Sequence, residues 1–156
     1  TLAGLMAKKK TEPEPFLSFV HDVDYEVIDA NPKLARALAG LSGRRYIFTN
    51  GSTEHAENVL RRLGIAALFN DVFDIVRANY VPKPKPAPYD RIVSDFELVA
   101  RETIFVEDMA RNLAPAKSRG MTTVLVAPAA GTATEEADYV ISDLAGWISE
   151  GGPSAS

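Results

Sequence analysis

The sequence predicts an α/β fold in which a parallel sheet is flanked by helices. From Arg45 onward, short runs of β-branched and aromatic residues alternate with stretches of helical periodicity. Each apolar run ends in polar residues, as expected where parallel strands deliver side chains to one edge of a sheet. With 156 residues, the chain is long enough to bury about two-thirds of its unfolded surface in one core.

The composition is that of an ordinary globular domain, with 46% hydrophobic and 24% charged residues. Lys and Arg number 17 against 21 Asp and Glu, and this net charge of −4 argues against a nucleic-acid polymer as partner. The chain has no cysteine, which excludes disulfides, thiolate zinc sites and cysteine nucleophiles, and its apolar runs are too short to span a membrane. We therefore expect a cytoplasmic enzyme or binding domain, of an oligomeric state that the sequence does not reveal.

Residues 1–40 are predicted to be mostly helical. Helical spacing of apolar residues predicts short helices over residues 2–6 and 16–20. The Asn31-Pro32 pair begins a third helix that ends at Gly40.

The α/β part of the chain is predicted to contain five strands and three helices. Ser52 is expected to cap the first of these helices, and Gly64 to end it in the left-handed conformation. The tail of residues 151–156 has no apolar anchor and is expected to fray. The predicted strands are Tyr46–Phe48, Val72–Val76, Thr103–Val106, Thr122–Val126 and Tyr139–Ile141, and the predicted helices cover residues 53–63, 87–97 and 112–119.

The first polar cluster at a strand end is Thr49-Asn50-Gly51-Ser52. A hydroxyl, a flexible glycine and the amides that open a helix can together hold an anionic oxygen. Such helix caps are common, so this cluster on its own is equally typical of a structural role.

The second cluster is the proline-rich segment Val81–Tyr89. Its alternating prolines stiffen the backbone and hold Lys83 in a fixed place before a helix, which suits a phosphate or a carboxylate. A loop of solvated lysines, or a ligand for the aromatic groove of a partner protein, is an alternative interpretation of the same segment.

The third cluster is the carboxylate pair Glu107-Asp108, which ends an apolar strand. Oxygen ligands at a strand end suit Mg²⁺, which takes one or two protein carboxylates and shares its other positions with water and substrate phosphate. Asp108 is the expected direct ligand, and Glu107 is expected to orient Lys83 or water. An acid that only caps a helix is the alternative.

The order of hydroxyl, lysine and acid pair is more specific than any one cluster, because each follows a successive strand. In this order the sequence resembles the haloacid dehalogenase-like hydrolase superfamily. Its second, third and fourth motifs resemble Phe48-Thr49-Asn50-Gly51, Lys83-Pro84-x-Pro86 and Phe105-Val106-Glu107-Asp108. The resemblance implies a Rossmann-like parallel sheet and covers about residues 1–142.

Within this superfamily the sequence is most similar to the pyrimidine 5′-nucleotidase-like branch. The similarity rests on the segment from His21 to Tyr25, on Ile47–Ser52 together with His55, and on Tyr80–Pro84. The resemblance implies a Mg²⁺-dependent phosphomonoesterase that acts on a small phosphorylated metabolite such as a pyrimidine nucleoside 5′-monophosphate. Dehalogenating members have a similar pattern but do not need a metal-binding carboxylate pair.

The resemblance also implies residue roles. Thr49 and the amides of Asn50 and Gly51 would bind the transferring phosphoryl group, and Lys83 would offset its charge. Asp108 together with Glu107 would hold Mg²⁺.

The first motif of the superfamily, an apolar strand that ends in Asp-x-Asp-x-Thr/Val, has no good copy in the chain. The candidate Asp22-Val23-Asp24 has Glu26 in the place of Thr or Val and lies only 27 residues before Thr49. We therefore expect the nucleophilic aspartate and its strand to lie upstream of Thr1, and Asp22 and Asp24 to have structural or pocket roles. The strands that end at Thr49 and Asp108 are then expected either to leave a vacant strand position between them or to pair directly.

On this interpretation, residues 1–40 form part of a helical cap and residues 41–150 a core that lacks its first strand. A signalling receiver domain is a rival, but there the acids precede the hydroxyl and the lysine. A catalytically inactive module that binds phosphate, or displays its proline-rich segment to a partner, is a second rival. His21 and His55 have no assigned role.

Overall fold

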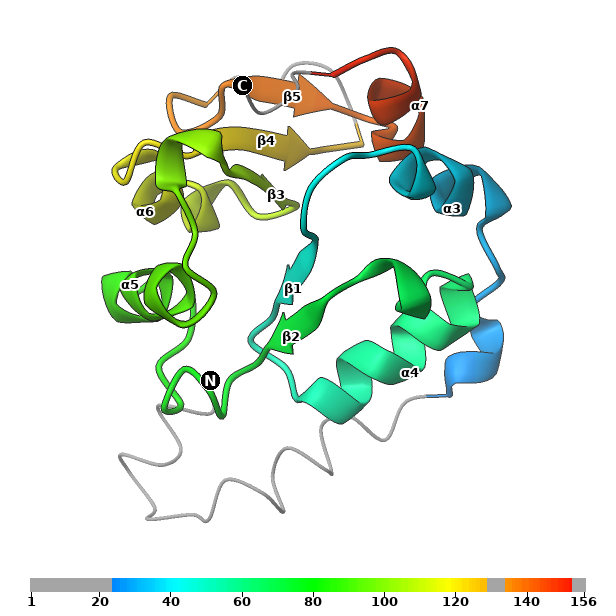
Figure 1. The fold of residues 1–156 in the computed structure, drawn as a ribbon, viewed down its shortest axis with the longest axis horizontal. Coiled ribbons are helices and arrows are strands. Elements are labelled where there is room, and N and C mark those ends of the chain that lie inside the picture. The colour runs from blue at the N-terminus through cyan, green and yellow to red at the C-terminus, as the bar shows by residue number, and fades with distance from the viewer. Residues whose placement is uncertain (1–23, 129–133, 153–156) are drawn as a thin grey trace. The chain divides into compact units, whose positions relative to one another are not determined.

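The structure is a computed structural model that describes residues 24–128 and 134–152. The chain divides into two compact units, Thr1–Pro82 and Lys83–Ser156 (Figure 1). Each unit has a parallel sheet of its own, so the predicted α/β class is confirmed. The helices predicted over residues 2–6 and 16–20 lie outside the described residues. No helix in the described ranges has the length and apolar composition needed to cross a membrane.

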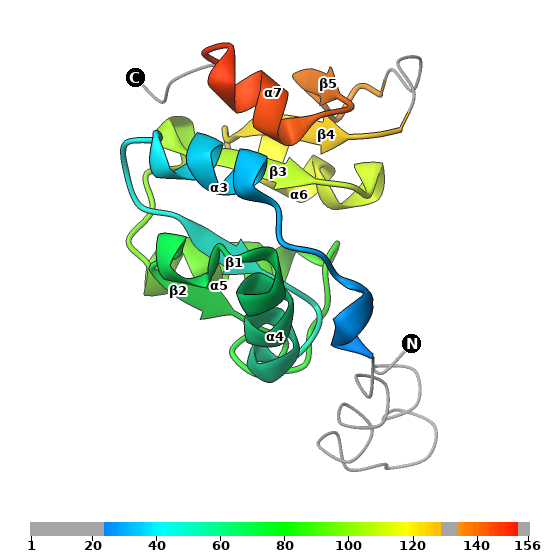
Figure 2. The same cartoon turned by 90° about the vertical axis from the view of Figure 1, so that its right-hand side faces the viewer.

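The first unit contains a two-stranded sheet and one long helix beside it. Strands β1 and β2 are parallel, with Ile47 opposite Val72, and α4 lies next to them (Figure 2). The rings of Phe48 and Phe73 meet edge to face with their centroids 5.4 Å apart. The elements are η1 (Tyr25–Val27), α3 (Pro32–Ala39), β1 (Tyr46–Phe48), α4 (Thr53–Leu63), η2 (Ala66–Leu68) and β2 (Asp71–Phe73).

The helix ends of the first unit follow the capping residues in the sequence. The side chain of Asn31 accepts the backbone N–H of Leu34 at the start of α3, and that of Ser52 accepts the backbone N–H of His55 at the start of α4. Gly64 ends α4 with a φ of 75°, the left-handed conformation that glycine adopts without strain. The predicted bounds of α4 are confirmed.

Strand β2 is shorter than predicted, because it ends at Phe73 and not at Val76. The side chain of Asp74 accepts the backbone N–H of Arg77, and the backbone N–H of Ala78 donates to the Asp74 carbonyl. These bonds begin a turn directly after Phe73. Asp74 therefore lies just after the end of the strand, whereas the sequence interpretation had placed it inside the strand.

The second unit contains a three-stranded parallel sheet in the order β3-β4-β5. Val106 lies opposite Val124, and Val124 lies opposite Tyr139. The strands that end at Phe48 and Glu107 belong to the separate sheets of the two units, and the vacant position or direct pairing expected between them stays a prediction. The elements are α5 (Pro86–Asp95), η3 (Ala100–Glu102), β3 (Ile104–Glu107), η4 (Ala110–Asn112), α6 (Ala114–Lys117), β4 (Thr122–Val126), β5 (Tyr139–Ile141) and α7 (Leu144–Ser149).

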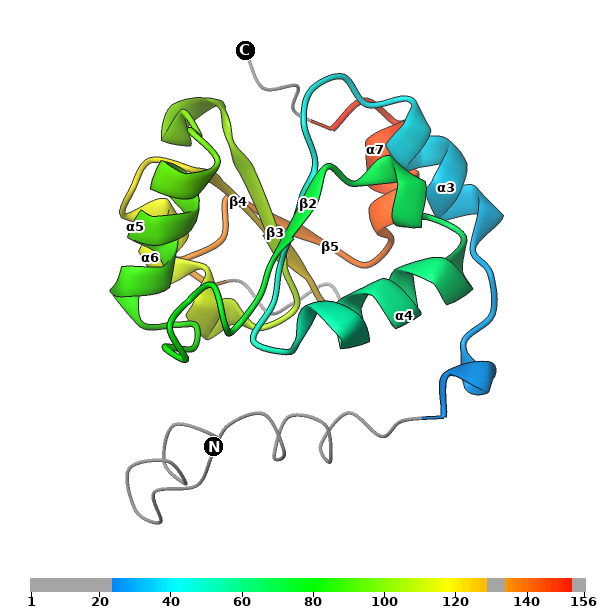
Figure 3. The same cartoon turned by 60° about the horizontal axis from the view of Figure 1, so that its bottom comes forward.

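The two faces of this sheet are covered by different helices (Figure 3). Phe105 packs edge to face on Tyr89 of α5, with ring centroids 5.8 Å apart. Tyr139 contacts Trp147 of α7. Because registered residues of parallel strands share a face, Phe105 and Glu107 face α5, whereas Tyr139 faces α7 on the opposite side.

Two helices of the second unit differ from their predicted bounds. α5 covers Pro86–Asp95, not residues 87–97. Glu97 has a φ of 51°, which lies outside the right-handed helical region, so the helix cannot extend through it. The helix predicted over residues 112–119 is split into η4 and the short α6. The division of the chain into a cap segment and a core stays a prediction.

Candidate active site

Thr49 directly follows β1 in the first unit. Its backbone N–H donates to the carbonyl of Phe73 at 3.0 Å, which extends the pairing of β1 with β2 by one residue. Its side-chain Oγ1 accepts the backbone N–H of Gly51 at 2.9 Å. Because this bond uses an oxygen lone pair, the hydroxyl keeps its proton as a donor for an anionic oxygen.

Asp74 lies at the same edge of the first sheet as Thr49, because both follow parallel strands. Its side chain is buried, and its two carboxylate oxygens accept hydrogen bonds from Thr53 and Arg77. The sequence interpretation missed this residue, although an acid directly after the apolar pair Val72-Phe73 is the same strand-end signal that identified Asp108.

His55 lies in the first turn of α4 and contacts the segment before α3. The Tyr25 hydroxyl and His55 Nδ1 are 2.8 Å apart, and the two rings are in contact. At the other end of α4, Arg62 donates hydrogen bonds to the carbonyls of Glu26 and Ile28. Side chains at both ends of α4 thus hold residues 25–28 along the helix.

Lys83 and Glu107 form a buried ion pair in the second unit. Lys83 Nζ lies 2.6 Å from Glu107 Oε2, and each side chain is only 8% exposed. The ammonium group also lies 5.5 Å from the centroid of the Phe105 ring. The contact expected between Glu107 and Lys83 is therefore present.

The remaining oxygen of Glu107 is also bonded. Glu107 Oε1 accepts the backbone N–H groups of Asp108 at 3.2 Å and Met109 at 3.4 Å. Burial raises the pKa of Glu107, but hydrogen bonds with Asp108, Lys83 and Asn112 and the Lys83 charge outweigh burial and lower the pKa below its usual value. Glu107 is therefore an ionised partner of Lys83.

Asp108 is exposed at the end of β3. Its hydrogen bond with Glu107, its partial burial and the Glu107 charge raise the pKa of Asp108. In the described part of the chain, no three His, Cys, Asp or Glu side chains gather in a metal-binding cluster. One strand-end carboxylate nevertheless fits Mg²⁺, which binds through one or two protein carboxylates and completes its shell with water and phosphate.

Asn112 is a second residue that the sequence interpretation missed. It is buried, its side chain lowers the pKa of Glu107, and its backbone carbonyl accepts the hydroxyl of Tyr89 at 2.7 Å. Burial, with the nearby Glu107 charge, raises the pKa of Tyr89, so this hydroxyl stays a donor. The available signal was an amide residue four positions after Asp108, directly before the apolar residues 113–116.

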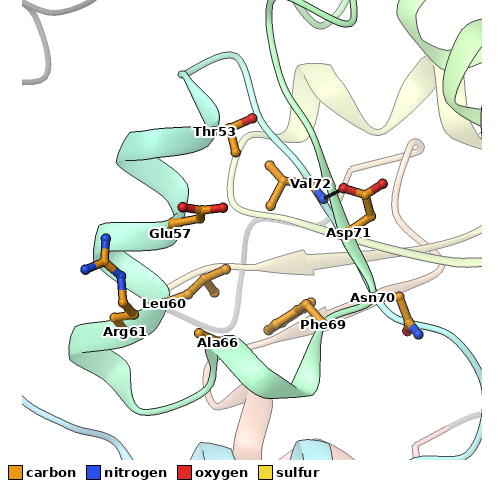
Figure 4. A pocket seen from close by; sticks show the side chains of 9 residues that line it. All are labelled: Thr53, Glu57, Leu60, Arg61, Ala66, Phe69, Asn70, Asp71 and Val72. Atoms are coloured by element: carbon orange, nitrogen blue, oxygen red, sulfur yellow. Dashed lines mark hydrogen bonds between the residues drawn. The ribbon is translucent and has the colours of Figure 1, made fainter.

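A hollow of about 340 Å³ lies in the first unit between α4 and β2 (Figure 4). Thr53 is at one end of it, near the start of α4, but Thr49, Asn50 and Gly51 are not among its lining residues. Its walls combine apolar, uncharged polar and charged side chains: Thr53, Glu57, Leu60, Arg61, Ala66, Phe69, Asn70, Asp71 and Val72.

The structure thus brings the predicted site residues together in two groups. Thr49, Asn50 and Gly51 form the strand-end loop of the first unit. Lys83, Glu107 and Asp108 gather at the end of β3 in the second. Asp22 lies outside the described residues, and Asp24 caps η1 by accepting the N–H of Glu26.

Three solved structures illustrate what this fold is similar to. An L-2-haloacid dehalogenase from Xanthobacter autotrophicus, with chloropropionic acid covalently bound, is 22% identical with a TM-score of 0.66, and the match covers 80% of this chain and 62% of that one. The UTR4 protein from Saccharomyces cerevisiae is 21% identical with a TM-score of 0.64, and the match covers 91% of this chain and 70% of that one. YfnB from Bacillus subtilis, bound to magnesium, is 19% identical with a TM-score of 0.68, and the match covers 88% of this chain and 60% of that one.

The chain spans less than two thirds of the length of the Xanthobacter dehalogenase and of YfnB. At these identities the likeness shows the fold. No curated protein matches the chain. A family model described as haloacid dehalogenase-like hydrolase matches residues 6–120, which is more than half of the sequence. The chain therefore belongs to the haloacid dehalogenase-like hydrolases.

Proposed function

We propose that this hydrolase is a Mg²⁺-dependent phosphomonoesterase whose substrate is a small phosphorylated metabolite, in the first instance a pyrimidine nucleoside 5′-monophosphate. The observation that carries the proposal is the end of β3, where the exposed carboxylate of Asp108 follows the buried Lys83–Glu107 ion pair. The choice of a pyrimidine nucleotide rests on the sequence resemblance of residues 21–25, 47–55 and 80–84.

Lys83 supplies positive charge for the phosphoryl group in the proposed reaction. A lysine is flexible in water, but here its ammonium group is held by Glu107 and by the ring of Phe105. A charge fixed in place before substrate arrives needs little reorganisation when negative charge develops on the phosphoryl oxygens. Glu107 therefore acts by positioning Lys83.

Asp108 is the proposed metal ligand, because Glu107 already uses its oxygens on Lys83 and on two backbone N–H groups. Mg²⁺ bound there would supply further positive charge to the phosphate oxygens. Thr49 would donate its hydroxyl proton to the phosphoryl group, with the backbone amides of Asn50 and Gly51 as further donors.

Hydrolysis of a haloacid is the second candidate function. It is favoured by the fold similarity to L-2-haloacid dehalogenases, one of them with chloropropionic acid bound. Only about a fifth of the residues are identical in these matches, so the similarity concerns the fold alone. The carboxylate pair at the end of β3 favours the phosphatase, since a haloacid provides no phosphate for a metal ion to bridge.

A binding comparison separates the two candidates. The 156-residue chain is mixed with uridine 5′-monophosphate and 2-chloropropionate in the presence of Mg²⁺, and saturation-transfer NMR records which ligand is bound. We expect the nucleotide to bind and Lys83→Met to abolish its signal, whereas Lys85→Met, in the same loop, leaves it unchanged. Binding of 2-chloropropionate without the nucleotide would support the dehalogenase and contradict the proposal.

A further inference from the structure

We propose that Asp74 is a positioning residue for the loop Thr49–Ser52, an inference that rests on the phosphate-binding role proposed for that loop. Asp74 follows β2 and is 6% exposed. Burying a carboxylate is unfavourable unless hydrogen bonds replace its water. The hydrogen bonds of Asp74 therefore indicate which parts of the chain its carboxylate holds together.

Both oxygens of Asp74 accept backbone hydrogen bonds. Oδ2 accepts the N–H of Thr53 at 3.1 Å and the Thr53 hydroxyl at 2.9 Å. Oδ1 accepts the N–H of Arg77 at 2.9 Å. One carboxylate thus ties the first residue of α4 to the turn that follows β2.

These bonds complete a series that fixes the whole loop against the end of β2. At the start of the loop, the N–H of Thr49 donates to the Phe73 carbonyl at 3.0 Å. In the middle, the N–H of Ile75 donates to the Gly51 carbonyl at 3.1 Å. At the end of the loop, the contact with β2 comes from the side chain of Asp74, so a substitution there can remove it.

Asparagine cannot replace this carboxylate. It has one oxygen, whereas Asp74 uses one oxygen on Thr53 and the other on Arg77. In Asp74→Asn the N–H of Thr53 or of Arg77 therefore faces the amide NH₂ group. The substitution also removes a negative charge near the loop, which by itself would strengthen the binding of an anion. A loss of phosphate affinity in Asp74→Asn consequently has to come from lost positioning.

Calorimetric titration of the 156-residue chain with inorganic phosphate tests the inference. We expect Asp74→Asn to weaken phosphate binding about tenfold, the effect of losing one charge-assisted hydrogen bond. Thr53→Ser keeps both bonds to Asp74 and should bind as the wild type does, whereas Thr53→Val loses the hydroxyl bond and should bind more weakly. Leu60→Ala, a core substitution in α4, lowers stability away from the loop and should leave the affinity unchanged.

Hydrogen exchange of the Thr53 amide reports on the bond between Asp74 and the first residue of α4, directly after the loop. We expect slow exchange in the wild type and in Leu60→Ala, and faster exchange in Asp74→Asn. If the wild type binds phosphate and Asp74→Asn binds it equally well or more tightly, the positioning role is overturned and the proposed function stands. If Leu60→Ala weakens binding as much as Asp74→Asn does, Asp74 is merely structural. If the wild type binds no phosphate, the phosphate-binding role is overturned and the inference falls with it.

Discussion

The buried ion pair of Lys83 and Glu107 is the residue-scale feature on which the candidate site depends. Forming such a pair gains little net stability, because both charges lose their water. Removing one member is different, since the other charge then remains buried without its partner. The hydrogen bonds that Glu107 receives from Asp108 and Met109 hold its carboxylate in place but do not neutralise it.

Lys83→Met is expected to lower the free energy of unfolding by about 3 kcal/mol, because it leaves the Glu107 charge unpaired. Urea denaturation measures this change. In the double variant Lys83→Met/Glu107→Gln the unpaired charge is gone, so part of the stability should return. A single variant as stable as the wild type would contradict the expected cost of leaving the Glu107 charge without its partner.

Asp138 gives the second unit a pH-dependent contribution to stability. The N–H of Thr123 is the largest influence on the pKa of Asp138, and with Lys117 it outweighs burial and lowers the pKa below 3.8. The stability that Asp138 contributes is therefore present above its unfolded pKa and is lost as the pH falls through the lowered, folded pKa.

Asp138→Asn is expected to cost about 1 kcal/mol near neutral pH, a value reduced because the side chain is 35% exposed and screened by solvent. The difference between wild type and variant should shrink as the pH falls below about 4. Denaturant unfolding at several pH values measures it. A difference that is independent of pH would show that the ionised carboxylate is not the source of the stability.

At the scale of secondary-structure elements, helix α4 follows its sequence signals closely. Ser52 starts it, and Gly64 ends it in the left-handed conformation with no atom near the position of a Cβ. Gly64→Ala is expected to cost about 1 kcal/mol, entirely from backbone conformation. Thermal unfolding measures this cost, with Gly40→Ala as control because Gly40 has ordinary helical angles. Equal effects of Gly64→Ala and Gly40→Ala would show that the cost does not come from the left-handed conformation of Gly64.

Strand β2 has a backbone edge that side chains cover. Asp71 Oδ1 accepts the N–H of Val72, while Arg77 donates to the Val72 carbonyl and pairs with Asp71 at 2.8 Å. These bonds occupy groups with which another strand would pair, a known protection against association at sheet edges.

Arg77→Ala removes part of this cover and is expected to increase self-association. Sedimentation velocity over a range of protein concentrations measures the change. Arg61→Ala, which removes an exposed arginine from α4, is the matched control and should stay like the wild type. Equal sedimentation of Arg77→Ala and wild type would show that the two charged side chains do not protect the edge.

At the scale of the whole molecule, the sequence predicted the elements whose signals are local. The bounds of β1, β4, β5 and α4 match, because apolar runs and capping residues set them. The end of β2 was wrong, because it depends on the hydrogen bond from Arg77 to Asp74, which apolar periodicity does not reveal. Asn112 was missed for a similar reason, since its role comes from contacts with Glu107 and Tyr89.

The candidate site was predictable to the extent that its residues end strands. Thr49 and Asp108 were identified in this way, and Lys83 by the rigid segment around it. Lys83 contacts the face of β3 that carries both Phe105 and Glu107. The alternation of side chains along a strand predicts that Phe105 and Glu107 share a face, but it does not predict that Lys83 packs on that face. Sequence motifs thus locate the charged groups, and the fold decides which of them are buried together.

The central claim is that Asp108 holds Mg²⁺ for a phosphate group beside Lys83. Calorimetric titration of the chain with inorganic phosphate, with Mg²⁺ and with EDTA, tests it most directly. The account predicts that Mg²⁺ tightens phosphate binding in the wild type and in Asp95→Asn, a control at an exposed aspartate, and that Asp108→Asn abolishes the effect of Mg²⁺. Phosphate binding of equal strength with Mg²⁺ and EDTA in the wild type would contradict it.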